Sequence, residues 1–174
     1  MDLLEATMRD ESLTFQQKRE LITEATDKVL HPLLENKNQS RELVELSLRT
    51  GTCVEKNLAT IHAELKRLVE NITQDVRTTV AKYLCAYGRP SQFVEFQKFF
   101  AIPEETQIVY VYFALTSFNA DILELFIEQK FSLNVDVLCG PLPKSVKDVP
   151  KDRQSDFTKC KELMANQGKY PYGV

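Results

Sequence analysis

Apolar side chains recur through most of this chain at the three- and four-residue spacing of amphipathic helices. The most regular run steps alternately by four and three positions and consists of Val54, Leu58, Ile61, Leu65, Leu68 and Ile72. This seam is typical of a helix buried within a bundle, or of an intermolecular coiled coil, which would make the protein a homodimer. The helix that carries the seam is expected to end near residues 71–75 or to continue to Ala86, ahead of Gly88 and Pro90.

The segment before the seam predicts two helices separated by a loop. Thr14 and Gln17 have the spacing of a capping box, in which each side chain bonds the backbone N–H of the other, so a helix is expected to start here. Pro32 lacks a backbone N–H and its ring clashes with the preceding turn, so this helix is expected to stop or kink near His31. Residues 36–40 then predict a short loop before the second helix.

The second half of the chain is rich in Phe and Tyr, and its pattern is also helical. Pro103 and the two glutamates after it favour a helix start. Residues 108–115 (IVYVYFAL) have the β-branched and aromatic content of a buried strand, but the chain offers no partner strand, so we predict a fully buried helix. Asn119 is expected to cap a further helix with its side chain. The predicted fold class is therefore all-α, with about six or seven helices in a bundle or in stacked hairpins.

A Gly-Pro-Leu-Pro run divides the chain into a long apolar-rich part and a short polar part. We predict a compact helical domain over residues 1–140, with 1–87 and 88–140 as its candidate subdomains. Residues 141–174 are expected to form a polar, mildly basic and partly flexible tail, with one short helix over residues 156–165. The end of this tail contains two tyrosines, and it is expected either to be loose or to dock through their rings.

Composition narrows the setting in which the protein works. Of the 174 residues, 43% are apolar and 27% are charged, as in an ordinary globular protein. The net charge is −3, and the acidic excess in the body argues against nucleic acid as a partner. No apolar stretch has the ~18 residues of a membrane-spanning helix. The first residues do not resemble a signal peptide, so a cytoplasmic protein is expected. Secretion after removal of a signal peptide is the alternative, since the number of cysteines is even.

The sequence predicts no catalytic, cofactor-binding or metal site, and therefore no enzyme. The four cysteines lie too far apart in sequence for a zinc or redox motif. Of the two histidines, His62 lies at the edge of the seam and His31 lies beside Pro32, where each is expected to serve packing or helix capping. Phosphate-binding loops, nucleophile elbows and zinc-protease motifs are absent. Glu104 and Glu105 are expected to be charges in the first turn of a helix rather than a catalytic pair.

Residues 114–134 resemble the later part of an ankyrin repeat, in which an Ala-rich helix turns through a Gly-His pair into a second helix and then a loop. The residues at matching offsets are Ala114, Ile122, Leu123, Phe126, Ile127 and Asn134. Phe118 and Asn119 stand in place of Gly-His, and Lys130 and Phe131 stand in place of Gly-Ala. The resemblance implies stacked helical hairpins and a role in binding proteins. An ordinary helical hairpin is the alternative that the same residues allow.

These observations favour a non-enzymatic protein–protein interaction module, such as an adaptor or scaffold. It would bury an apolar segment of a partner protein against a preformed helical surface. One candidate surface is the seam, and the other consists of Phe93, Phe96, Phe99 and Phe100. The aromatic residues could instead fill a large core. The alternative function is a carrier of a small apolar ligand, held in a cavity between helices.

Overall fold

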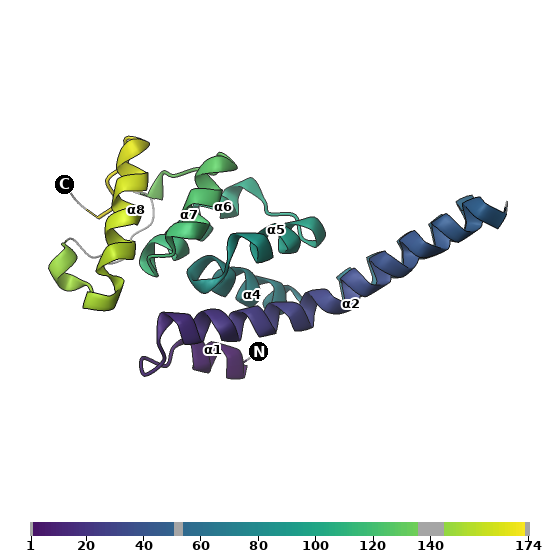
Figure 1. Ribbon diagram of the computed structural model, residues 1–174, viewed down its shortest axis with the longest axis horizontal. Coiled ribbons are helices and arrows are strands. Elements are labelled where there is room, and N and C mark those ends of the chain that lie inside the picture. The colour runs from purple at the N-terminus through teal and green to yellow at the C-terminus, as the bar shows by residue number, and fades with distance from the viewer. Residues whose placement is uncertain (1, 51–53, 136–144, 173–174) are drawn as a thin grey trace.

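The computed structural model of the chain is all-α, as the sequence predicted (Figure 1). It describes residues 2–50, 54–135 and 145–172, and within these ranges it contains eight α-helices and no strand. The helices are α1 (Asp2–Met8), α2 (Phe15–Thr50), α3 (Val54–Asn71), α4 (Gln74–Tyr87), α5 (Pro90–Phe99), α6 (Glu104–Thr116), α7 (Ala120–Glu128) and α8 (Gln154–Asn166). Two short 3₁₀ turns, η2 (Val146–Asp148) and η3 (Lys151–Arg153), precede α8.

Helix α4 forms the centre of the core. Its residues Val80, Leu84 and Cys85 are completely buried, and it packs against α2, α5 and α6. Helix α6 contains the ambiguous stretch 108–115, so the prediction of a helix there is confirmed. Its inner face is buried against α4 and α7, because a helix this rich in apolar residues needs neighbours on more than one side.

Helix α2 is one helix of 36 residues, whereas the sequence predicted two helices and a loop. It starts as predicted: Gln17 N donates to Thr14 Oγ1 at 3.1 Å, and Thr14 N donates to Gln17 Oε1 at 2.8 Å. Pro32 lies inside the helix on its exposed side, and its neighbours Leu30 and Leu33 are buried in the core. Their burial outweighs the local cost of a proline, so of the two alternatives expected near His31, a stop or a kink, the stop is wrong.

The predicted loop over residues 36–40 is helical as well. Within it, the Ser40 hydroxyl donates to the backbone carbonyl of Asn36 at 2.7 Å, one turn earlier. At ~1.5 Å per residue, α2 is about 54 Å long. Its C-terminal half projects away from the other labelled helices (Figure 1), and α3 packs against α2. Helix α2 therefore continues through the polar stretch, and it packs against α3, a neighbour that residues 36–40 alone do not reveal.

Helices α3 and α4 are separate, which agrees with the nearer of the two expected ends of the seam helix. Helix α3 ends at Asn71, and Thr73 caps α4 because its Oγ1 accepts a hydrogen bond from Val76 N at 3.4 Å. Three residues of the seam are half-buried and pack against the core, namely Leu65, Leu68 and Ile72. The other three lie on α3, but their side chains are outside the described part of the chain: Val54, Leu58 and Ile61.

The C-terminal segment packs into the same core and does not form a loose tail. Helix α8 coincides with the helix predicted over residues 156–165, and it lies against α7. The Tyr172 hydroxyl donates to the carbonyl of Leu115 at 2.7 Å, so the alternative of a docked tyrosine is confirmed. Residues 145–172 thus pack on the body, while residues 141–144 of the expected tail lie outside the described part. The fully buried side chains of α8 and the residues after it are Phe157, Cys160, Met164 and Tyr172.

Two turns have left-handed backbone conformations at residues other than glycine. Phe118, between α6 and α7, has φ 56°, and Lys130, after α7, has φ 58°. Such a conformation costs an ordinary residue about 1–2 kcal/mol. Both are positions where the ankyrin repeat carries the glycines of its Gly-His and Gly-Ala pairs. The α6–α7 hairpin fits either of the alternatives expected for residues 114–134, so the ankyrin resemblance stays a prediction.

Candidate functional site

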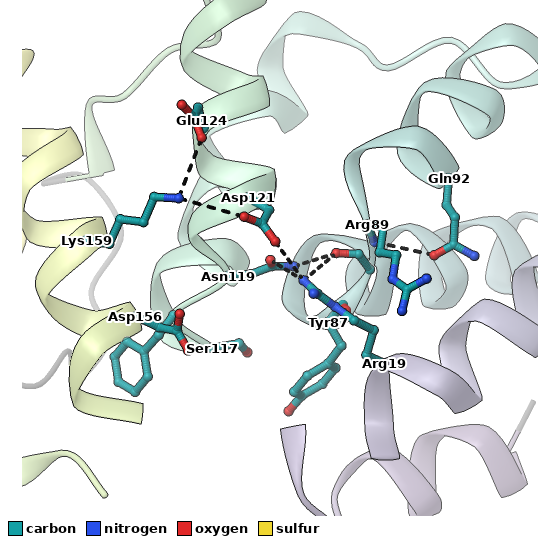
Figure 2. A network of polar contacts seen from close by, with 12 residues as sticks. Arg19, Tyr87, Arg89, Gln92, Ser117, Asn119, Asp121, Glu124, Asp156 and Lys159 are labelled. Carbon is teal, nitrogen blue, oxygen red and sulfur yellow. Dashed lines mark hydrogen bonds and ion pairs between the residues drawn. The ribbon is translucent and has the colours of Figure 1, made fainter. Parts of the chain in front are cut away.

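Segments far apart in the sequence meet in a polar junction around Arg19 (Figure 2). Arg19 Nε donates to the carbonyl of Tyr87 at 2.8 Å. Its Nη2 donates to the carbonyl of Gly88 at 3.3 Å and to Asn119 Oδ1 at 3.0 Å. Only 14% of the Arg19 side chain is exposed. Both carbonyls belong to the C-terminal end of α4, where backbone acceptors lack helical partners, so Arg19 caps that helix from α2.

Asn119 completes the junction from the turn before α7. Its side chain is buried, and Nδ2 donates to the carbonyl of Gly88 at 2.9 Å and to that of Cys85 at 3.2 Å. The sequence predicted that this side chain would cap α7; Asn119 occupies the N-cap position, but its side chain makes no cap hydrogen bond and binds α4 instead. Glycine is required at position 88 for a different reason: a Cβ there would lie 2.5 Å from the carbonyl oxygen of Leu84 in the last turn of α4.

Arg153 connects the start of α8 to the same turn. Its Nη2 donates to the carbonyls of Ser117 and Phe118 at 2.8 and 3.0 Å, which satisfies acceptors at the C-terminal end of α6. Its Nη1 binds the carboxylate of Asp156, and its guanidinium lies 3.7 Å from the centroid of the Phe15 ring. Burial lowers the pKa of Arg153, and the nearby Asp156 opposes this shift. These contacts fix the position of α8 relative to α6.

An open cavity of about 330 Å³ lies beside the junction, and charges of both signs line it. Asp121 lies 3.5 Å from Arg19 and 3.9 Å from Lys159, and Lys159 also pairs with Glu124 at 3.8 Å (Figure 2). The lining cations are Arg19, Arg153 and Lys159, and the lining anions are Asp121, Asp152 and Asp156. Because the signs balance and several of these charges pair with one another, the cavity favours structural cohesion over capture of a charged ligand.

An apolar groove of about 450 Å³ lies toward the other ends of helices α4 and α6. It is formed by residues 74–82 of α4, the end of α5, the loop over residues 100–103 and residues 106–113 of α6. Its apolar residues are Phe96, Phe99, Phe100, Ala101, Ile102, Pro103, Val109, Tyr110 and Phe113. Its polar residues are Gln74, Arg77, Thr78, Lys82 and Thr106. The junction holds the C-terminal ends of both helices, so it keeps the walls of this groove in place.

Of the predicted aromatic surface, Phe99 is the member that reaches the groove as a half-buried side chain. Phe93, Phe96 and Phe100 are 0, 2 and 5% exposed, so they belong to the core. Phe96 and Phe100 also form the floor of the groove, whereas Phe93 does not line it. The prediction of a contact surface is therefore wrong for Phe93, because the inward face of α5 carries it.

The sequence prediction missed the part of the groove that α6 contributes. Val109, Tyr110 and Phe113 are half-buried, although residues 108–115 were expected to be fully buried. A helix that is apolar on every side presents apolar side chains outward wherever no neighbour covers it. The all-round apolar character of α6 is thus the signal that could have identified this surface.

The histidines and cysteines do not form a reactive site within the described residues. His31 and His62 are exposed on α2 and α3, and His31 Nε2 lies 3.9 Å from Glu35. Cys85 and Cys160 are free and buried. Burial raises the pKa of the Cys85 thiol well above its usual range and that of Cys160 to about 12, so neither is a thiolate nucleophile at neutral pH. Cys53 and Cys139 lie outside the described part. No group of three or more metal-binding side chains occurs among the described residues.

Comparison of the chain with protein families, with curated proteins and with solved structures found no match. Among the described residues, no helix is long and apolar enough to cross a membrane.

Proposed function

We propose that the protein is a non-enzymatic interaction module that binds an apolar segment of a partner protein in the groove between α4, α5 and α6. The observation that carries the proposal is the set of half-buried apolar side chains in this groove, which includes Phe99, Ile102, Val109 and Phe113. Covering such side chains releases about 25 cal/mol for each Å² of apolar surface removed from water. Aromatic side chains in a depression are also the residues that most often anchor a partner.

The rigidity of the groove supports the same proposal. Its floor consists of Phe96 and Phe100, which belong to the core, and its walls belong to helices held by Arg19, Asn119 and Arg153. A preformed surface loses little conformational freedom when a partner binds, so more of the contact free energy appears as affinity. An adaptor or scaffold requires a docking surface of this kind.

A carrier of a small apolar ligand is the alternative function, and the same groove supports it. Its volume of about 450 Å³ falls within the range of small-molecule sites. A carrier and an interaction module differ in what they bind with groove-dependent affinity, a small apolar molecule or a peptide segment. The test below separates them.

We also propose a cytoplasmic location for the protein. The free thiols of Cys85 and Cys160 suit a reducing compartment, although both are buried. A homodimer would use the seam on α3 as an intermolecular contact. Light scattering after gel filtration separates the two states: a monomer has a mass of 20.0 kDa, and a homodimer has twice that mass.

The test of the proposed function is a selection of peptides from a displayed random library against the full chain. Val109→Arg places a long charged side chain in the groove, so it should block binding there. Val94→Arg is the matched control, because Val94 is a half-buried valine on α5 that does not line the groove. We expect clones that bind the wild-type chain and the Val94→Arg variant and do not bind the Val109→Arg variant.

Two other outcomes contradict the proposal. If every selected clone binds the Val109→Arg variant as well as the wild-type chain, the groove is not a peptide site. If no groove-dependent clone is found and a small apolar dye binds the wild-type chain but not the Val109→Arg variant, the protein is a ligand carrier.

A further inference from the structure

We infer that the segment bound in the groove is acidic as well as apolar, with carboxylates beside its apolar anchors that pair with Arg77 and Lys82 of α4. The inference rests on the proposed function, because it names the partner chemistry of the same groove. Arg77 and Lys82 supply the positive charge of the groove lining, and no carboxylate among the described residues lines it. An apolar channel with one sign of charge along its edge selects an amphipathic segment of the opposite sign.

Arg77 is held at the edge of the groove by the end of the neighbouring helix. Its Nε donates to the carbonyl of Ile72 at 3.0 Å, and its Nη2 donates to that of Val69 at 3.2 Å. The guanidinium lies 5.3 Å from the centroid of the Phe100 ring, on the floor of the groove. Within the described residues it forms no ion pair. It is therefore a preorganised cation whose charge no carboxylate of those residues neutralises at close range.

Lys82 marks the same edge closer to α1. Its Nζ lies 5.5 Å from the centroid of the Phe113 ring, and 34% of its side chain is exposed. Nζ also lies 3.5 Å from the carboxylate of Glu5 on α1. Glu5 thus occupies the lysine with the kind of group that we infer for the partner. A carboxylate of the bound segment would compete with Glu5 for Lys82.

The net charge of the whole chain is negative and would favour a basic segment, not the acidic one that we infer. With a net charge of −3, long-range attraction favours basic peptides over acidic ones. The acidic residues on the groove helices are Asp75, Glu95, Glu104 and Glu105, and none of them lines the groove. Glu95 pairs with Lys98 on the same helix, and the other three are exposed. Preference for an acidic segment must therefore come from close contact with Arg77 and Lys82.

The first test reads the sequences of the groove-dependent clones from the selection described above. We expect Asp and Glu to outnumber Lys and Arg in them and to flank large apolar residues. The most enriched clone is then made as a fluorescein-labelled peptide, and its affinity is measured by anisotropy. Changing its acidic residues to Lys should weaken binding to the full chain about ten-fold or more.

The second test changes the chain itself. Lys82→Gln should weaken binding of the acidic peptide, whereas Glu5→Gln should strengthen it because it releases Lys82 from its internal partner. A peptide with Gln in place of its acidic residues should respond to neither change. Arg77→Gln should also weaken binding of the acidic peptide. Because Arg77 bonds the end of α3, the helix content of this variant is checked by circular dichroism. If Arg77→Gln does not fold, the opposite effects of the other two variants still decide.

The outcomes distinguish the inference from the function on which it rests. Groove-dependent clones that are basic or uncharged, or an acidic peptide that Lys82→Gln and Glu5→Gln leave unchanged, would overturn the inference and leave the interaction module intact. Absence of any groove-dependent clone would overturn the proposed function and the inference together.

Discussion

The polar junction and the apolar groove lie toward opposite ends of helices α4 and α6, and they differ in what their side chains contact. At the junction, Asn119, which is buried, and Arg19 and Arg153, which are mostly buried, donate hydrogen bonds to carbonyls of neighbouring segments. At the groove, half-buried apolar side chains such as Phe99 and Val109 line a surface that solvent reaches. One pair of helices therefore contributes internal hydrogen bonds at one end and an open apolar surface, the proposed binding site, at the other. Changes at the junction should therefore affect stability, and changes at the groove should affect binding.

Arg19→Leu should have the largest effect on stability. It removes the side-chain donor to the carbonyl of Tyr87 and one of the two donors to that of Gly88, which keeps Asn119 Nδ2, and it takes the donor away from Asn119 Oδ1. The expected loss is about 3 kcal/mol of unfolding free energy, since a hydrogen bond from a charged donor contributes about 1.5–3 kcal/mol. Urea unfolding followed by circular dichroism measures it. The control is Arg9→Leu, because Arg9 forms an exposed pair with Glu5 and should cost less than ~1 kcal/mol. Equal losses for the two variants would refute the cohesive role of the junction.

Asn119→Ala should destabilise the chain by about 2 kcal/mol, because the carbonyls of Cys85 and Gly88 lose buried amide donors. The same urea experiment applies. Gln97→Ala removes a comparable amide from an exposed pair, in which Gln97 and Gln129 bond each other at 2.8 Å, and should cost less than ~0.5 kcal/mol. An Asn119→Ala variant as stable as Gln97→Ala would show that the turn before α7 does not depend on this side chain.

Phe99→Ala should affect binding in the groove more than it affects stability. Phe99 is half-buried, so its truncation should cost no more than about 1.5 kcal/mol of unfolding free energy, well below the loss for a buried phenylalanine. Binding of the peptide selected for the groove should nevertheless fall about ten-fold, because a central aromatic anchor is removed. Anisotropy titration and urea unfolding give the two values. A large loss of stability with unchanged binding would place Phe99 in the core instead.

The smallest expected effect is a pH dependence at the edge of the groove. A hydrogen bond from Tyr83 lowers the pKa of Glu5 below its usual value of 4.5. Burial is the main cause that raises the pKa of Tyr83 to about 12, and the same hydrogen bond is the second cause. A carboxyl group with a lowered folded-state pKa stabilises the protein above its usual pKa, and this stabilisation disappears as the pH falls. Stability should thus differ between the wild-type chain and Glu5→Gln above pH 4.5 and converge at lower pH. Thermal unfolding at several pH values measures this; a constant difference would contradict it.

Local signals in the sequence predicted the parts of the fold that depend on neighbouring residues. The capping box of Thr14 and Gln17 and the helix over residues 156–165 are both present. The junction could not be predicted in this way: Arg19 binds Asn119 across 100 positions, and Arg153 binds Ser117 across 36. A short polar side chain before a helix predicts a cap. Because the end of α4 lies beside Asn119, its side chain instead donates to the carbonyl of Gly88.

The groove was predictable in kind but not in detail. The sequence indicated an aromatic surface, yet the pattern of α5 does not show which of its aromatic residues face the core. Helix α6 was identified, but its apolar residues on all sides hid the distinction between a core face and an open face. Likewise, Pro32 predicts a helix end on local grounds, and packing of Leu30 and Leu33 decides otherwise.

The docking of Tyr172 has a consequence for the order in which the protein can fold during its synthesis. Phe118 in the α6–α7 turn packs against Phe157 and Tyr172, whose rings leave the ribosome long after that turn does. Until then, the apolar surface around Leu115 and Phe118 has no cover, and nascent chains with such surfaces are prone to associate. The contacts of Leu115 and Phe118 with these rings are therefore completed only after residue 172 has left the ribosome.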